Sequence, residues 1–355
     1  MSNYGIHMGT ILIDNIVYTL DKTTHTAIVE KNVEAGYCGD VVIPEYVYYQ
    51  GETYRVTAVG FEACLDCLRL TSVVIPYSVT ELYDRAFEGC TGLTSVRIPH
   101  SIRDIGWNTF ARCDGLTSAV IEQGVPYMGA DMFRECESLR SVVLPDSIVE
   151  IGAFAFAGDK SLTSITLPPC VRLINDMAFL GCAALTTINI PDTLTFIGDQ
   201  AFCGAIGLEH ITIPSSVTAI GLDAFGSCCG LTSLVIPDSV TEIGEDAFED
   251  CAGLKSVVLP NTITRIAKNL FDHCLSLESI SIPNGVREID GHAFYDCDSL
   301  TTISLPATLE RISSGAFIGC EHIETILVPH GMRSKFRKIR ALKPWRDKIV
   351  EVNAF

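Results

Sequence analysis

The sequence predicts a solenoid of α/β type, in which a long parallel β-sheet lines one face and short helical or 3₁₀ turns line the other. Two observations support this class. A 23-residue repeat runs through most of the 355 residues, and each copy alternates apolar and polar residues before a proline. A fixed period of roughly 20–50 residues is typical of stacked arrays, in which each copy packs on its neighbours. The 48% hydrophobic content supplies a continuous core.

Three residue types mark the period. A proline follows the first segment of eleven copies, at a constant step except for one double step that passes Glu122. A leucine stands six residues before each mark, replaced by Ile323 in the last copy, and a phenylalanine stands eleven residues after each mark from Pro76 to Pro306, Glu122 included. The prolines are Pro76, Pro99, Pro145, Pro168, Pro191, Pro214, Pro237, Pro260, Pro283, Pro306 and Pro329. The phenylalanines are Phe87, Phe110, Phe133, Phe156, Phe179, Phe202, Phe225, Phe248, Phe271, Phe294 and Phe317.

Each segment of the unit predicts one element of a coil. Residues 231–236 alternate apolar and polar side chains, which indicates a strand with one buried face. Proline then ends the strand, because it cannot donate to the ladder. Residues 240–243 predict a short extended piece that turns at Gly244, and the Ala247-Phe248-x-x-Cys251 spacing predicts one helical or 3₁₀ turn. Since a copy is too short for two strands and a full helix, each copy is one coil.

The exposed face of the sheet is the candidate binding surface. Its outward positions are mostly Ser, Thr and Val, and such a flat, neutral face suits contact with another protein over a broad area. Arg97, Asn189 and His210 interrupt this monotony and are the candidate partner-binding residues. The serines are expected to be inert, because no base is placed to activate them.

Three parts follow along the chain: a cap over 1–69, the repeat solenoid over 70–329 and a basic cap over 330–355. The first cap contains predicted short strands over 10–20 and 26–33, a hairpin turn at 50–52 and a degenerate first coil over 56–69.

The last cap carries eight basic and two acidic residues, so its net charge is +6 and that of the remaining chain is −24. The apolar spacing over 332–342 predicts a helix that ends at Lys343-Pro344. Its bases are either solvated on a capping helix or form a surface for an anionic partner or an acidic second copy.

One copy, over 116–138, departs from the others. Glu122 replaces the proline, and Pro126-Tyr127 interrupts the second segment. Either a local bend or a binding epitope explains this departure.

Ten of the fifteen cysteines fall on the period, with Asp159 and Ala205 in the two gaps. The thiol column is interpreted as core packing, because parallel side chains one coil apart hold their Cβ atoms too far apart for disulfides. The lone Cys64-x-x-Cys67 pair is weak evidence for zinc or redox chemistry.

Composition excludes several classes of protein. The apolar content excludes intrinsic disorder, and no window approaches 18 uninterrupted apolar residues, so no membrane span is expected. A net charge of −18 argues against nucleic acid as the main partner. No nucleotide, metalloprotease or calcium-loop motif is present, and His273-Cys274 is not expected to be a catalytic pair. No catalytic residue, cofactor or metal site is therefore predicted.

The I-P, A-F and F-x-x-C marks over 70–322 resemble the BspA-like family of leucine-rich repeat proteins, and so do the flanks at 41–57 and 328–351. The resemblance implies a leucine-rich repeat fold with a β-rich amino-terminal cap and a helical carboxy-terminal cap. It also implies a non-enzymatic protein that binds host or neighbouring-cell proteins, as an adhesin at the cell surface or secreted. The alternative is an intracellular structural scaffold, favoured by the unpaired thiols and the missing secretory signal at residues 1–8, and a cytoplasmic location follows if Met1 is the native start.

Overall fold

The computed structural model describes residues 9–353, which fall into two compact units, one ending at Leu162 and the other starting at Thr163. The start of the chain, on which the expectation about a secretory signal rests, lies outside the described residues. The strands of the first unit are β1 (Ile11–Ile13), β2 (Ile16–Asp21), β3 (Thr26–Glu30), β4 (Gly39–Val42), β5 (Tyr46–Tyr49), β6 (Glu52–Val59), β7 (Leu70–Val74), β8 (Glu81–Leu82), β9 (Ser95–Ile98), β10 (Asp104–Ile105), β11 (Ser118–Ile121), β12 (Ser141–Val143) and β13 (Glu150–Ile151).

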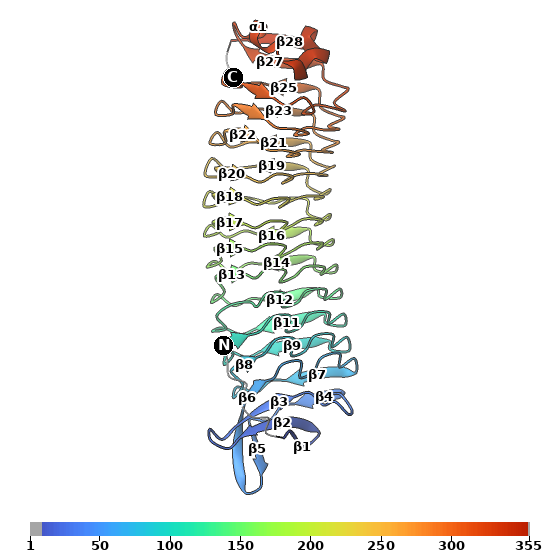
Figure 1. Ribbon diagram of the computed structural model, residues 1–355, viewed down its shortest axis with the longest axis vertical. Helices are drawn as coiled ribbons and strands as arrows, with labels where there is room; N and C mark the ends of the chain where they lie inside the picture. Colours follow the sequence, from blue (N-terminus) through green and yellow to red (C-terminus); the bar gives the residue numbers. More distant parts are fainter. Residues whose placement is uncertain (1–8, 354–355) are drawn as a thin grey trace. The chain divides into compact units, whose positions relative to one another are not determined.

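Antiparallel hairpins begin the first unit and parallel coils follow (Figure 1). Strands β1, β2 and β3 form an antiparallel meander, and β5 pairs with β6 in a second hairpin. The single strand region predicted over 10–20 is two strands, because Asp14 and Asn15 both adopt positive φ and reverse the chain. From β6 onward the pairing is parallel: β8 and β10 continue one ladder, and β9, β11 and β12 form another, with paired residues one repeat apart in sequence.

The second unit consists of coils and a closing segment. Its elements are β14 (Ser164–Thr166), β15 (Leu173–Ile174), β16 (Thr187–Asn189), β17 (Phe196–Ile197), β18 (Ala219–Ile220), β19 (Ser233–Val235), β20 (Glu242–Ile243), β21 (Ser256–Val258), β22 (Arg265–Ile266), β23 (Ser279–Ser281), β24 (Glu288–Ile289), β25 (Thr302–Ser304), β26 (Arg311–Ile312), β27 (Thr325–Pro329), the helix α1 (Arg333–Phe336), the 3₁₀ segment η1 (Arg340–Lys348) and β28 (Ile349–Val352).

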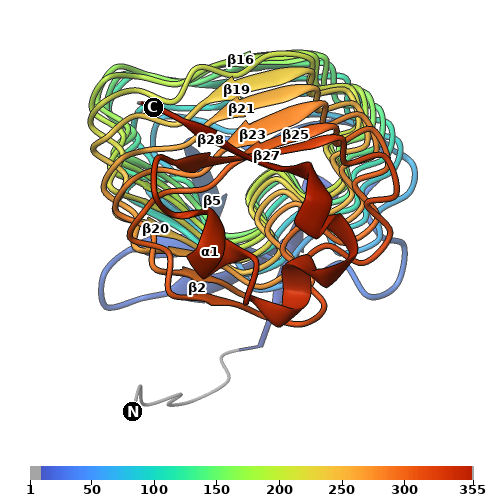
Figure 2. The ribbon, with the colours of Figure 1, turned by 90° about the horizontal axis from the view of Figure 1, so that it is seen from above.

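The strands of this unit pair in parallel on two sides of the coils. On one side β14 pairs with β16, and β19, β21, β23, β25, β27 and β28 form a longer sheet (Figures 1 and 2). On the other side the two-residue strands that follow the proline turns pair in two groups, one containing β15, β17, β18 and β20 and the other β22, β24 and β26. One coil departs from the pattern, because residues 208–213 form no strand. Both units are therefore parallel β-solenoids, as the repeat period predicts.

The third side of each coil consists of turns, and the helical or 3₁₀ turns predicted for it are not found there. In most coils two residues adopt positive φ, for example Arg85 and Gly89 on either side of Phe87. A left-handed residue cannot continue a right-handed helix, so the segment becomes successive turns. These turns hydrogen-bond to the next coil, because the Phe87 N–H donates to the Thr109 carbonyl at 2.9 Å and the Arg85 N–H donates to the Trp107 carbonyl at 2.8 Å.

Stacked phenylalanine rings fill the core of each unit. In the first unit the ring centroids of Phe87 and Phe110 are 5.1 Å apart and the ring planes are nearly parallel, and in the second unit those of Phe202 and Phe225 are 5.3 Å apart. All the column rings have almost no exposure. A single coil would leave its ring half covered, so stability comes from the interfaces between neighbouring coils.

The carboxy-terminal segment differs from its prediction. Instead of one helix over 332–342, α1 covers four residues, Ile339 is extended, and η1 contains Pro344. A 3₁₀ piece tolerates this proline because it is short and breaks at Trp345. Phe336 and Leu342 are fully buried, so the segment still closes the end of the unit (Figure 2).

Candidate functional site

The outward positions of β9, β11 and neighbouring strands form the exposed face of the first unit. Successive side chains on a strand point to opposite faces, so Val96 and Ile98 are buried while Ser95 and Arg97 are exposed. The adjacent strands β7 and β12 add the exposed valines Val74 and Val143. The outward side chains of these strands are small, uncharged serines and valines apart from Arg97.

A partly buried carboxylate organises that region. Glu122 follows β11, and its side chain retains only 11% exposure, beneath the 68% exposed side chain of Arg97. One carboxylate oxygen accepts a hydrogen bond from Arg97 Nε at 2.5 Å, and the other accepts the His100 backbone N–H at 2.9 Å and lies 2.9 Å from His100 Nδ1. Burial alone would raise the pKa of Glu122, but the hydrogen bonds from His100 and Arg97 and the charge of Arg97 lower it to about 2.

Tyr77 completes what we call the Glu122 cluster, formed by Tyr77, Arg97, His100 and Glu122. The Tyr77 ring lies 4.7 Å from the His100 ring, and its hydroxyl donates to Glu122 at 3.5 Å. Tyr77, Arg97 and His100 come from two consecutive coils and are all exposed. The cluster thus presents an aromatic ring, an imidazole and a guanidinium that a carboxylate holds in place.

Of the three predicted partner-binding residues, Arg97 lies in this cluster, whereas Asn189 and His210 belong to the second unit. The amide of Asn189 is exposed but engaged: its Oδ1 accepts the Leu167 N–H at 2.8 Å, and its Nδ2 donates to the Leu167 carbonyl at 3.1 Å. His210 is exposed in the segment 208–213, which forms no strand. No hydrogen bond joins Asn189 to His210 within the described part of the chain.

Sequence reasoning missed Tyr77 and His100, although a signal was present. Both directly follow a proline mark, where most other copies have Asp, Asn, Ser or another small or turn-forming residue, His330 after the last mark excepted. A bulky ring at that position is a departure from the repeat as clear as Glu122 itself.

The cysteines form no disulfide within residues 9–353. Column thiols instead donate to a carbonyl of the preceding coil, as Cys113 Sγ does to Phe87 O at 3.2 Å and Cys251 Sγ does to Phe225 O at 3.1 Å.

In the first unit, the Cys64 thiol and the Tyr37 N–H stabilise the thiolate of Cys67 and lower its pKa to about 7. Across the described residues, no group of histidine, cysteine and carboxylate side chains could hold a metal ion.

Comparison with known proteins gives a family match. The family described as "BspA type Leucine rich repeat region (6 copies)" matches over residues 57–182, 105–231, 149–263 and 218–339. No curated protein matches the chain. Within the described residues, no helix has the length and apolar character needed to cross a membrane.

Solved structures agree with this match. A leucine-rich repeat protein from Bacteroides ovatus is 28% identical with a TM-score of 0.70, over 97% of this chain and 100% of the other. A leucine-rich cell surface protein from Faecalibacterium prausnitzii is also 28% identical, with a TM-score of 0.57, over 95% of this chain and 98% of the other. The pneumococcal vaccine antigen PcpA shares the fold at 16% identity and a TM-score of 0.58, over 90% of this chain and 87% of the other.

Proposed function

Because the chain belongs to the family of BspA-type leucine-rich repeat proteins, we propose that it is a non-enzymatic module that binds another protein through the Glu122 cluster and the strand face around it. The single observation that carries this proposal is the partly buried carboxylate of Glu122, which holds Arg97 and His100 on a face whose other side chains are small and uncharged.

Arginine and tyrosine are enriched among residues that dominate binding energy at protein interfaces. Arg97 is already held by Glu122, so it loses less side-chain freedom when a partner binds. The exposed Val74 and Val143 offer apolar area beside the polar cluster. Together these features give an apolar, aromatic and cationic contact surface on a rigid sheet.

We place this binding activity at the cell surface, where an adhesin would meet host or neighbouring-cell proteins. This part of the proposal is supported by the similarity to the F. prausnitzii protein, which is described as a cell surface protein. The second candidate is an intracellular scaffold, and the absence of disulfides among the described cysteines favours it.

The substitution Glu122→Pro tests the proposal, because it restores the residue that the repeat usually has at this position. It removes the carboxylate that holds Arg97 and His100, together with the hydrogen bond from Glu122 N to Ile98 O, which other copies lack. We expect a folded protein that loses about 1 kcal/mol of stability and binds its partner at least tenfold more weakly.

The partner is sought by capture from extracellular-matrix proteins and, in parallel, from lysate of the cell that makes the protein. Binding of the captured partner is then measured for Glu122→Pro, for Arg97→Ala and for the matched control Arg265→Ala, an exposed arginine on β22. A third variant, with both Asn189 and His210 replaced by serine, tests the other two predicted residues. If Glu122→Pro and Arg97→Ala bind as tightly as Arg265→Ala, the cluster is not the contact surface.

A further inference from the structure

The phenylalanine column of the second unit ends without a final stacked ring. Phe317 stacks on Phe294 with the ring centroids 5.3 Å apart and the planes within 6°. The next position of the repeat, one period further along the chain, is Arg340, which lies in η1 and is exposed. Trp345 meets Phe317 from the capping segment, but edge-on, with centroids 6.3 Å apart and planes at 78°.

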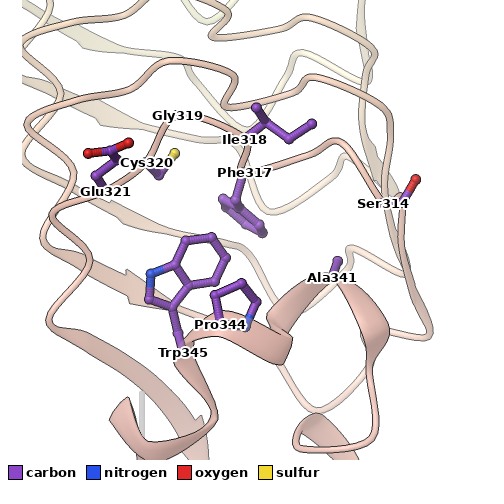
Figure 3. Close-up of a pocket in the computed structure, with 9 residues that line it drawn as sticks. All are labelled: Ser314, Phe317, Ile318, Gly319, Cys320, Glu321, Ala341, Pro344 and Trp345. Atoms are coloured by element: carbon purple, nitrogen blue, oxygen red, sulfur yellow. The ribbon is translucent and has the colours of Figure 1, made fainter.

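A cavity remains at this end of the column. It has a volume of about 240 Å³, and its apolar walls are Phe317, Ile318, Ala341, Pro344 and Trp345 (Figure 3). Sites for whole drug-sized ligands span roughly 300–1,000 Å³, so this cavity suits one side chain rather than a larger molecule. Ile318 is exposed, which places one wall at the surface.

Positive charge surrounds this cavity. Arg340, Lys343 and Arg346 are exposed and adjoin the lining residues Ala341, Pro344 and Trp345 in sequence. Within the described chain, none of the three makes an ion pair, although Glu321 also lines the cavity.

Three other bases of the cap are engaged. Arg337 pairs with Asp347 at 3.3 Å, and Lys335 and Lys348 donate to the carbonyls of Ala307 and Ile323 at 2.7 and 2.5 Å. Three unpaired bases of the cap therefore adjoin the cavity, whereas Lys338, which is exposed and makes no ion pair among the described residues, lies elsewhere in the cap.

We propose that this cavity is a second binding site, which takes one aromatic side chain from an acidic segment of a partner protein. An inserted ring gains apolar burial against Phe317 and Pro344 and packs beside Trp345, in the manner of the column below it. The three bases beside the cavity attract the carboxylates that flank the ring, whereas the net charge of −18 on the whole chain repels such a segment from the remaining surface. The site is independent of the Glu122 cluster.

Trp345 supplies the readout. The chain has two tryptophans, so Trp107→Phe, at an exposed position of the first unit, leaves Trp345 as the only one. The probe is an acidic peptide with one central phenylalanine and no other aromatic residue. We expect a saturable change in Trp345 emission, at least tenfold weaker affinity when the phenylalanine is serine, and weaker binding at high salt.

Two variants and a matched control complete the experiment. Ala341→Phe fills the cavity and Lys343→Glu reverses one of the adjoining charges, and both are expected to weaken binding at least tenfold. Lys338→Glu makes the same charge change elsewhere in the cap and is expected to leave binding unchanged. Circular dichroism confirms that each variant is folded.

Four results would each overturn the proposal: no saturable change, equal binding of the phenylalanine and serine peptides, equal effects of Lys338→Glu and Lys343→Glu, or a change in Trp345 emission with protein concentration alone. The last result would identify a second copy of the chain as the occupant. None of these results bears on the Glu122 cluster, which the variants leave intact.

Discussion

Asp159 occupies a position of the cysteine column that ten other copies fill with a thiol. It is fully buried, and its Oδ1 accepts the Cys136 N–H at 2.8 Å, while its Oδ2 has no partner among the described residues. Burial raises the pKa of Asp159 well above its usual value, against the opposing effect of the hydrogen bond from Cys136. Glu122 shows the opposite shift, because charged and polar donors face both of its oxygens.

The substitution Asp159→Cys tests this interpretation, because it installs the residue usual for the column. Between the unfolded pKa of about 3.8 and the raised folded pKa, the native state binds more protons than the unfolded state, so wild-type stability falls as pH rises. We expect the variant to be about 1–3 kcal/mol more stable than wild type at pH 8, with a smaller advantage at pH 4. Denaturant unfolding at the two pH values measures both. An advantage that is the same at both values, or absent, would contradict the assignment.

The coil is the element on which stability depends, and its central contact is the phenylalanine ring. Phe225 lies between Phe202 and Phe248, at centroid distances of 5.3 and 5.6 Å, and is fully buried. Removing this ring deletes contacts with both neighbouring coils at once.

We therefore expect Phe225→Ala to cost about 3–5 kcal/mol in the free energy of unfolding. Val235→Ala, on the exposed face of β19, is the matched control and is expected to change stability by less than about 0.5 kcal/mol. Thermal and denaturant unfolding measure the difference. Wild-type stability of the Phe225→Ala protein would mean that the ring is not part of the core.

At the scale of the whole chain, the repeated burial of the cysteine column determines which thiols are accessible to reagents. Most of the fifteen thiols lie in the buried column, whereas Cys38, Cys170 and Cys229 are exposed. Alkylation of the native protein, followed by peptide mass spectrometry, is expected to label these three first and most others only in denaturant. Cys67 is the informative intermediate case, since its pKa is lowered to about 7 but its side chain is buried. Disulfides linking successive column cysteines would contradict this pattern.

The predictions that succeeded concern features repeated at a fixed spacing. The marks at Pro76 and Phe87 recur in register, so the parallel pairing and the buried ring column follow from the sequence. Prediction of the turns failed, because the three-residue spacing from Phe87 to Cys90 fits a helical turn and successive β-turns equally well. The positive φ of Arg85, which decides between them, is not apparent from an arginine in the sequence.

The candidate site was predicted only in part for a related reason. Arg97 stands out on an exposed face, but its connection to His100 and Tyr77 passes through Glu122, which is 25 residues away from Arg97 and 45 from Tyr77. Such a cluster depends on side-chain conformations, which a periodic pattern does not specify.

The amino-acid sequence by itself determined the period, the parallel stacking of coils and the identity of the buried columns, because a repeated apolar pattern has few ways to be buried. Only the tertiary structure decided the turn conformations, the engagement of Asn189 by Leu167 and the cavity beside Phe317. These features arise where one coil meets the next or where the capping segment meets the last coil. Neighbouring coils differ in their side chains, and the capping segment differs from a coil, so contacts between residues far apart in the sequence decide how these parts pack.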